Sequence, residues 1–282
     1  MTPFGAHDGG MSRPDPLPFE PPTRALVRDV SARFDLCLRE KADVDIDGVR
    51  ARLQHAAYVA VLERLGIEVE QVAPNDAHPD GCFVEDTAVV TGAHAALTIP
   101  GAPSRRAETA EILPALERHC VVHRMTGDAR LDGGDVLRVG CTLFVGLSSR
   151  TNEAGASFLA SVAANDGLET RTIPLAGGLH LKSVCTLLDP TTVVCAPSVG
   201  QNVTHALSTS GATVLEVPEP VGANLLALGP NVLVSASAPR TASLIRARGL
   251  HVIELDLSEI HLADGALTCL SIRIPRKGAW TV

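Results

Sequence analysis

Residues 136–173, VLRVGCTLFVGLSSRTNEAGASFLASVAANDGLETRTI, contain one complete structural unit of this chain. Two apolar runs at 136–139 and 143–145 flank the turn Gly140-Cys141, a pattern that is typical of a β-hairpin. A helix is expected from about Asn152 to Asn165, because Asn152 is a favoured N-cap residue and a glycine follows at position 167. Residues 168–173 then predict a third strand. The unit is therefore two antiparallel strands, a helix and one more strand.

The same order of elements recurs along the chain. Expected hairpins, helices and third strands lie at 83–99, 104–119 and 120–123, at 183–196, 200–210 and 214–217, and at 225–235, 239–248 and 252–255. The fifth unit is expected to be a hairpin at 267–274, closed by a strand at 23–28, a helix at 47–65 and a strand at 67–72. The two ends of the chain are thus expected to meet in one unit.

The starts of the five units are evenly spaced. Equivalent positions are separated by 49, 48, 41 and 45 residues, at Asp86, Asp135, Ser183, Asn224 and Cys269. Periods of this size indicate repeated supersecondary units, and stacking them around an axis would bury the hairpins and leave the helices outside. We therefore predict an α/β fold, a five-bladed ββαβ propeller with pseudo-fivefold symmetry. One doubly wound α/β sheet is the alternative.

Composition narrows the class of protein. The 282 residues are 45% hydrophobic and 20% charged, with a net charge of −8, which disfavours nucleic acid and anionic membranes as partners and favours small cations. Seven cysteines without a CxxC pair predict no zinc site and a reducing, cytoplasmic location, since no signal peptide or 18-residue apolar run is present. The Pro- and Gly-containing stretch 1–22 predicts a flexible leader, followed by one catalytic domain at 23–282.

Unusual polar groups lie at the starts of the units. They are Glu85 and Asp86, then Asp132 and Asp135 around a Gly-Gly pair, then His180, then Asn224, and finally Cys269 in the stretch DGALTCLS at 264–271. Taken singly, each has an ordinary structural explanation: carboxylates cap turns, a lone histidine satisfies a core group, and most cysteines are packing residues. Together, at one phase of the repeat, they would converge on one cavity, which favours chemistry.

The combination also indicates a kind of substrate. A histidine beside a cysteine can hold a thiolate and move a proton. Several carboxylates would raise the pKa of a nearby thiol, so they make sense if a cation enters and neutralises them. A guanidinium is a planar cation whose N–H groups match carboxylates.

At these residues the chain resembles the dimethylarginine dimethylaminohydrolases, which belong to the guanidino-modifying superfamily. The resemblance extends from Ala25 to about Lys277. It rests on seven blocks in order: ALVR at 25–28, PDGCFVEDTAVV at 79–90, PGAPSRRAE at 100–108, LDGGDVL at 131–137, FVGLSSRTN at 144–152, GLHLKS at 178–183 and DGALTCLS at 264–271.

The resemblance implies a fold, a reaction and a set of catalytic residues. The fold would be the five-bladed propeller called a pentein. The reaction would convert N-omega-methylated L-arginine, either asymmetric dimethylarginine or monomethylarginine, to L-citrulline and dimethylamine or methylamine. Cys269 would attack the guanidino carbon and form a covalent thiouronium intermediate, which water activated by His180 would hydrolyse. Asp132 would orient His180.

The resemblance also assigns substrate-binding residues. Glu85 and Asp86 would hold the guanidinium, Arg105 and Arg150 the substrate carboxylate, and Asp80 the α-amino group. Leu38 would lie on a lid near the site. No cofactor or metal is expected, the partner is a small cationic substrate, and a homodimer remains open. The alternatives are an arginine deiminase-type hydrolase that releases ammonia, an amidinotransferase, and a non-catalytic propeller that acts as a binding module.

Overall fold

The computed structural model describes residues 22–41, 43–175 and 179–276 of the chain. The leader expected at 1–22 lies outside the described residues, apart from Pro22. Within the described residues, no helix is long and apolar enough to cross a membrane.

The strands of the described residues form five three-stranded sheets with one common plan. In each sheet the first strand is antiparallel to the middle strand, and the middle strand is parallel to the third. In that order the strands are β15 (Ile272–Ile274), β1 (Arg24–Arg28) and β2 (Glu68–Val72); β3 (Ala88–Val90), β4 (His94–Leu97) and β5 (Val121–Arg124); β6 (Val136–Val139), β7 (Thr142–Leu147) and β8 (Glu169–Pro174); β9 (Cys185–Asp189), β10 (Thr192–Cys195) and β11 (Thr213–Glu216); and β12 (Leu226–Leu228), β13 (Asn231–Ser235) and β14 (His251–Leu255). The alternative of one doubly wound sheet is therefore wrong.

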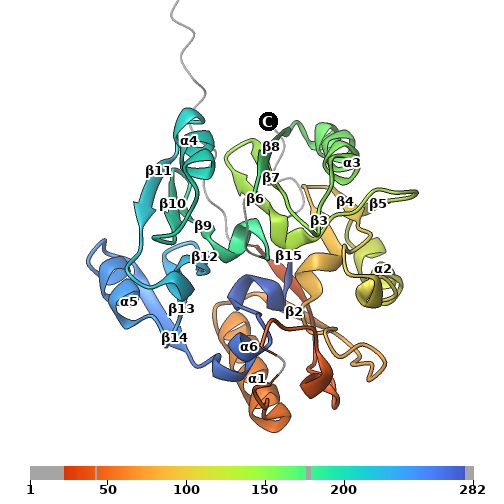
Figure 1. The fold of residues 1–282 in the computed structure, drawn as a ribbon, viewed down its shortest axis with the longest axis horizontal. Coiled ribbons are helices and arrows are strands. Elements are labelled where there is room, and N and C mark those ends of the chain that lie inside the picture. Colours follow the sequence, from red (N-terminus) through yellow and green to blue (C-terminus); the bar gives the residue numbers. More distant parts are fainter. Residues whose placement is uncertain (1–21, 42, 176–178, 277–282) are drawn as a thin grey trace, which may run out of the picture.

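One helix connects the middle strand of each sheet to its third strand. These helices are α1 (Gly48–Arg64), α2 (Glu108–Glu117), α3 (Glu153–Ala163), α4 (Gln201–Thr209) and α5 (Pro239–Arg246). Two of them begin where the sequence predicted, because the Asp47 carboxylate accepts from the backbone N–H groups of Val49 and Arg50, and the Asn152 side chain accepts from that of Gly155. In Figure 1 the five helices lie around the outside, and the first strand of each sheet lies nearest the centre.

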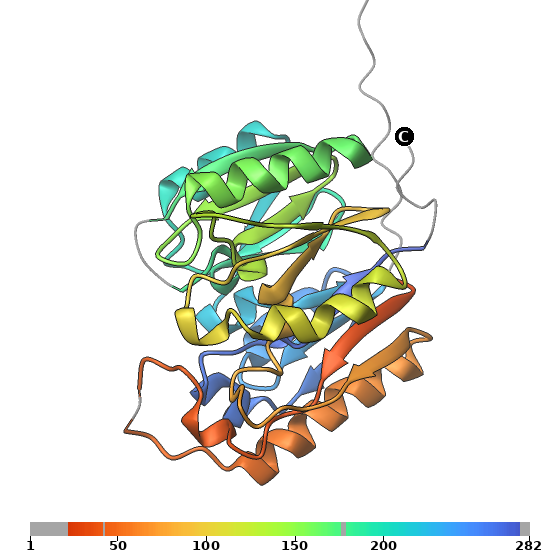
Figure 2. The same ribbon diagram turned by 90° about the vertical axis from the view of Figure 1, so that its right-hand side faces the viewer.

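The two ends of the described chain pair in the same sheet, as the sequence predicted. Strand β15 runs antiparallel to β1, with Leu26 opposite Ile272 and Arg24 opposite Ile274. The side view in Figure 2 shows helices α1, α2 and α3 running in similar directions across the outside of the sheets. The contacts between helix and sheet are apolar, as in the cluster that joins Leu159 and Val162 of α3 to Leu143 of β7.

The starts of the units differ from the sequence prediction. Residues 84–87 and 267–270 were expected in strands but form the 3-10 turns η2 (Val84–Thr87) and η8 (Leu267–Leu270), so the hairpin expected at 267–274 is instead η8 followed by β15. The other first strands are also preceded by 3-10 turns, which are η4 (Gly133–Asp135), η6 (Leu181–Ser183) and η7 (Pro220–Ala223). Side chains and local hydrogen bonds favour the turn, as when the Thr87 hydroxyl donates to the Val84 carbonyl at 2.7 Å.

These turns lie against one another, with η2 next to both η8 and η4, and η4 next to η6. They therefore bring together polar groups that are far apart in the sequence. The sequence did not predict the short helix α6 (Ser258–Leu262), which precedes η8.

Candidate active site

A small pocket contains seven of the nine residues that the sequence singled out as site residues. Its volume is about 30 Å³. The seven residues are Leu38, Asp80, Asp86, Arg105, Arg150, His180 and Cys269, and the remaining lining comes from Phe83, Leu179, Ala263, Asp264 and Gly265. Asp132 lies next to His180, and Glu85 lines a different cavity.

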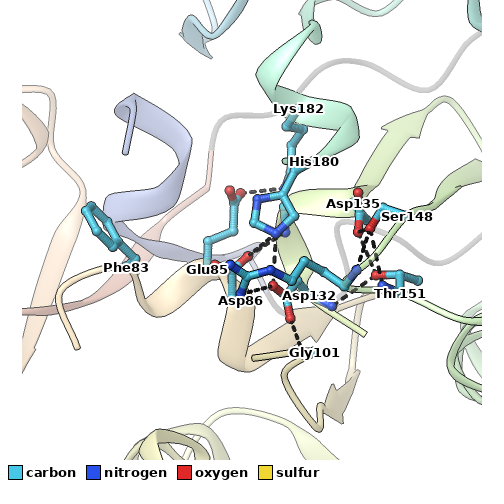
Figure 3. Close-up of polar contacts among 12 residues, drawn as sticks. Phe83, Glu85, Asp86, Gly101, Asp132, Asp135, Ser148, Thr151, His180 and Lys182 are labelled. Carbon is cyan, nitrogen blue, oxygen red and sulfur yellow. Dashed lines mark hydrogen bonds and ion pairs between the residues drawn. The ribbon is translucent and has the colours of Figure 1, made fainter. Parts of the chain in front are cut away.

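His180 and Asp132 form the central contact of the site. Each precedes a 3-10 turn as its N-cap residue, His180 before η6 and Asp132 before η4. Nε2 of His180 lies 2.9 Å from Oδ2 of Asp132, whose other oxygen accepts from the backbone N–H of Gly101 at 2.8 Å (Figure 3). Burial lowers the pKa of His180, but Asp86, Asp132 and Asp135 outweigh it and raise the pKa to about 9. The imidazole is therefore protonated at neutral pH.

Cys269 lies in turn η8, which precedes β15, and this partly exposed residue lines the pocket. Burial of the sulfur, followed by the negative charges of Glu85 and Asp86, raises the pKa of this thiol to about 12. The thiol is therefore neutral at pH 7 as long as no cationic substrate neutralises these carboxylates. Such a cysteine becomes a nucleophile only when something changes the local charge.

Asp86 and Arg105 form a buried ion pair beside His180. Nη1 of Arg105 lies 2.6 Å from Oδ2 of Asp86, whose Oδ1 accepts from the backbone N–H of Gly134 at 2.9 Å. Arg105 also donates to the Phe83 carbonyl and to both oxygens of Glu108. Despite its burial, Asp86 has a pKa of about 2 because His180 and Arg105 favour the carboxylate.

Arg105 was expected to bind the substrate carboxylate, and its pairing with protein carboxylates changes this expectation. Its guanidinium is already bonded to protein acceptors, because the adjacent Glu108 is fully buried and faces it. Arg150 is more available, since its side chain is 20% exposed and its nearest carboxylate oxygen, on Asp132, is 3.8 Å away. Sequence reasoning missed Glu108, although its i,i+3 spacing from Arg105 was a usable signal.

Glu85 does not face the same pocket as Asp86. Its Oε1 accepts from Lys182 at 2.5 Å and from Arg273, and it lines a separate cavity of about 230 Å³. Successive residues of a 3-10 turn point about 120° apart, since three residues make one turn. Glu85 accordingly pairs with Lys182 and Arg273, while Asp86 pairs with Arg105. That Glu85 and Asp86 together hold a guanidinium stays a prediction.

The segment around Leu38 covers one side of the pocket. The backbone N–H of Leu38 donates to Oδ1 of Asp80 at 3.0 Å, and that of Glu40 donates to Asp264 at 2.6 Å. Leu38 itself is 41% exposed. Two backbone hydrogen bonds thus hold the segment to the pocket.

Gly134 lets the turns approach each other closely. A Cβ atom at this position would lie 2.7 Å from Nδ1 of His180 and 3.0 Å from Oδ1 of Asp86. Any side chain there would displace one of the two. The Gly-Gly pair of the sequence is therefore a packing requirement of the site.

Asp86, Asp132 and His180 also have the composition of a metal site. One ligand atom from each lies within 4.8 Å of the others. Each of these groups already has a protein hydrogen-bond partner, as Asp86 does in Arg105. The geometry therefore suits a protonated histidine between two carboxylates without a metal ion.

Comparison with known proteins decides the family. The family model described as N,N dimethylarginine dimethylhydrolase, eukaryotic, matches residues 22–275. The chain belongs to this family. The resemblance noted from the seven sequence blocks is thereby confirmed.

Relatives of this dimethylarginine dimethylhydrolase family member are found among bacteria. The N(G),N(G)-dimethylarginine dimethylaminohydrolase of Streptomyces coelicolor is 39% identical over 261 residues, which cover 90% of this chain and 98% of that protein. The protein of the same name from Pseudomonas aeruginosa is 32% identical over 231 residues, covering 80% of this chain and 89% of that one.

Solved structures of the family superpose well. A cysteine-to-serine variant of the Pseudomonas aeruginosa protein, complexed with citrulline, has a TM-score of 0.84 at 29% identity, covering 89% of this chain and 99% of that one. The N-terminal domain of a cyanobacterial arginine dihydrolase bound to its substrate has a TM-score of 0.79 at 17% identity, covering 89% of this chain and 98% of that one, which shows a shared fold.

Proposed function

We propose that this protein hydrolyses N-omega-methylated L-arginine to L-citrulline and a methylamine, through a covalent intermediate on Cys269. One observation carries the proposal. A partly exposed thiol shares a pocket with a protonated histidine that is paired with a buried aspartate, in a member of the dimethylarginine dimethylhydrolase family. A thiol, an acid–base group and carboxylates for a cation are what removal of an amine from a guanidinium requires.

The fold that supports this site is a five-bladed ββαβ propeller with pseudo-fivefold symmetry. Five sheets of identical topology, each with its helix on the outside, support this assignment. The polar 3-10 turns then correspond to the inner ends of the blades. In this arrangement residues 23–282 form one catalytic domain.

The first half of the reaction begins when the substrate guanidinium enters beside Asp86 and His180. Its positive charge offsets the carboxylates that raise the thiol pKa, so Cys269 loses its proton to solvent. The thiolate forms a bond to the guanidino carbon. His180 then donates its proton to the departing nitrogen, the C–N bond breaks, and dimethylamine or methylamine leaves.

The second half releases the product. His180, now neutral, takes a proton from a water molecule that attacks the thiouronium carbon. The C–S bond breaks, the sulfur leaves as the thiolate, and the proton on the product oxygen passes to the thiolate directly or through solvent, which yields neutral thiol and citrulline. Asp132 keeps the ring oriented and stabilises each imidazolium, because it accepts a hydrogen bond from Nε2.

The amino-acid part of the substrate binds at the outer part of the pocket. Arg150 pairs with the carboxylate, Asp80 with the α-amino group, and Leu38 covers both. Arg105 contributes by fixing Asp86, which receives the guanidinium. Glu85 lies between the pocket and the larger cavity and forms the floor of the pocket. The expected cytoplasmic location and homodimer stay predictions.

The experiment compares substrates and two cysteine variants. Incubation with asymmetric dimethylarginine yields citrulline and dimethylamine in equal amounts. Cys269→Ser abolishes turnover, whereas Cys141→Ser, which alters an exposed cysteine, leaves it unchanged. Substantial activity in Cys269→Ser would refute the covalent mechanism. Release of ammonia from arginine without turnover of any methylated arginine would move the protein to the deiminase class. An arginine deiminase of Mycobacterium avium is 29% identical to this chain over 192 residues.

A further inference from the structure

Asp135 is a fully buried carboxylate that none of the proposed chemical steps uses. It lies in turn η4, three residues after Asp132. Its Oδ1 accepts from the backbone N–H of Leu181 at 2.9 Å, and its Oδ2 accepts from the hydroxyls of Ser148 at 2.6 Å and Thr151 at 2.7 Å. Figure 3 shows these two hydroxyls beside Asp135, on the side of the site away from Glu85.

Each donor belongs to a segment that carries a pocket residue. Leu181 directly follows His180 in the chain. Ser148 and Thr151 flank Arg150, and the Ser148 oxygen also accepts from the backbone N–H of Arg150 at 3.0 Å. The Thr151 oxygen accepts from the backbone N–H of Asp132 at 3.2 Å. One carboxylate therefore joins the segments of His180, Asp132 and Arg150.

The direction of these hydrogen bonds requires a group that only accepts. The Leu181 N–H can only donate. The Ser148 oxygen already accepts from the N–H groups of Arg150 and Thr151, so its hydroxyl proton must point to Asp135. An asparagine amide would direct N–H protons at hydroxyls that have few acceptor sites left. A carboxylate satisfies all three donors, and an amide does not.

We propose that Asp135 is a positioning residue that aligns His180 with Arg150. With this alignment, Arg150 holds the substrate carboxylate while the guanidino group lies at His180. This inference rests on the proposed function of the same site. Asp135 touches none of the reacting atoms and acts through the two segments that it joins. Its negative charge also acts on His180, together with those of Asp86 and Asp132, while Arg150 and Cys269 face the same pocket.

The test is Asp135→Asn, measured with asymmetric dimethylarginine and normalised to the folded fraction. Misplacement of a catalytic group by about 1 Å can lower the rate about 100-fold, so we expect kcat/KM to fall about 100-fold. Displacement of Arg150 should raise KM, and displacement of His180 should lower kcat. Loss of the Asp135 charge also lowers the pKa of His180, which is followed by NMR of histidine-labelled protein, with the signal assigned from His180→Gln. A role confined to folding would lower the folded fraction but leave kcat and KM of the folded protein unchanged.

Matched variants separate the explanations. Asp166→Asn removes another carboxylate with several donors, Thr91, Ala93 and His94, outside the pocket, and should leave kcat/KM within about twofold. Thr151→Ser keeps the hydroxyl and should retain activity, whereas Thr151→Val should raise KM without altering the charge near His180. If Asp135→Asn folds poorly, this second pair still provides the test.

Two results would overturn different claims. Kinetics and a His180 titration in Asp135→Asn that match those of Asp166→Asn, or equal activity in Thr151→Ser and Thr151→Val, would refute the positioning role. Absence of citrulline formation by the unaltered protein from any methylated arginine would instead refute the proposed function.

Discussion

Nε2 of His180 lies 2.9 Å from Oδ2 of Asp132, and both side chains are almost completely buried. The second oxygen of Asp132 is held by the backbone N–H of Gly101, so the carboxylate cannot turn away from the ring. This contact fixes the ring orientation and leaves Nδ1 as the nitrogen that can change its protonation state. This pair can act in acid–base catalysis only if the position of the imidazole and the charge of the carboxylate both matter.

Replacing Asp132 with asparagine tests the charge while keeping the shape. We expect kcat to fall about 100-fold or more, because an amide stabilises the imidazolium poorly and can favour the wrong tautomer. The pKa of His180 should fall as well, since Asp132 is one of the groups that raise it. Citrulline formation over a pH series measures both effects. Asp128→Asn, at an exposed side chain, is the control, and equal activity in the two variants would count against the pair.

The state of Cys269 leads to a prediction about its reactivity. Its raised pKa of about 12 means that the thiolate is scarce below that pH and increases as the pH rises. Neutral iodoacetamide should therefore label Cys269 slowly at pH 8 and progressively faster up to pH 10, as peptide mass spectrometry can follow. A cationic haloacetamidine should gain at least about tenfold over its neutral amide at Cys269, because a pKa lowered by one unit gives ten times more thiolate.

Exposed Cys141 serves as the internal reference in the same digest. It should show no such preference for the cationic reagent. Rapid labelling of Cys269 by iodoacetamide at neutral pH would mean that its thiolate exists before any cation enters.

Gly134 offers a steric test of the contact between the turns. In Gly134→Ala the new methyl group would lie 2.7 Å from Nδ1 of His180, so the ring must shift. We expect kcat/KM to fall about 100-fold for a displacement of about 1 Å. Gly48→Ala is the control, because a Cβ at this first residue of α1 meets only Arg52 at 3.9 Å, and kcat/KM should stay within about twofold. Unchanged kinetics in Gly134→Ala would show that the ring position is not critical.

Much of the fold follows from local sequence signals. Helix α1 begins after Asp47 and α3 after Asn152 because both side chains cap the helix, and such signals act over a few residues. The meeting of the chain ends in one unit also followed, because the N-terminal strand and helix were expected to complete the C-terminal unit. The alternation of strand and helix was therefore predictable.

The direction in which individual side chains point was not predictable from local sequence signals. Glu85 and Asp86 are neighbours in the sequence, and only the 3-10 turn sends one to Lys182 and the other to Arg105. Arg105 was expected to be available for a ligand, but a buried Glu108 accepts its N–H groups. These outcomes depend on contacts between turns from different units, which no local pattern encodes.

The pairing of Lys182 with Glu85 leads to a prediction about stability. Both side chains are buried, Glu85 also pairs with Arg273, and Oε2 of Glu85 has no hydrogen-bond partner. Removing Lys182 leaves a buried carboxylate with one cation instead of two. Because loss of one partner of a buried ion pair costs about 3–5 kcal/mol and Arg273 remains, we expect Lys182→Met to lower the free energy of unfolding by about 3 kcal/mol in urea titration.

The control is Arg171→Met, which breaks the exposed pair with Glu169 and should change the free energy of unfolding by less than about 1 kcal/mol. The double variant Lys182→Met with Glu85→Gln should lose less than the sum of the two single variants, by about 1–3 kcal/mol, because both partners of the Lys182–Glu85 ion pair are then neutral. Strict additivity, or a loss in Lys182→Met as small as in the control, would show that Arg273 alone neutralises Glu85. In that case the floor of the pocket would not depend on Lys182.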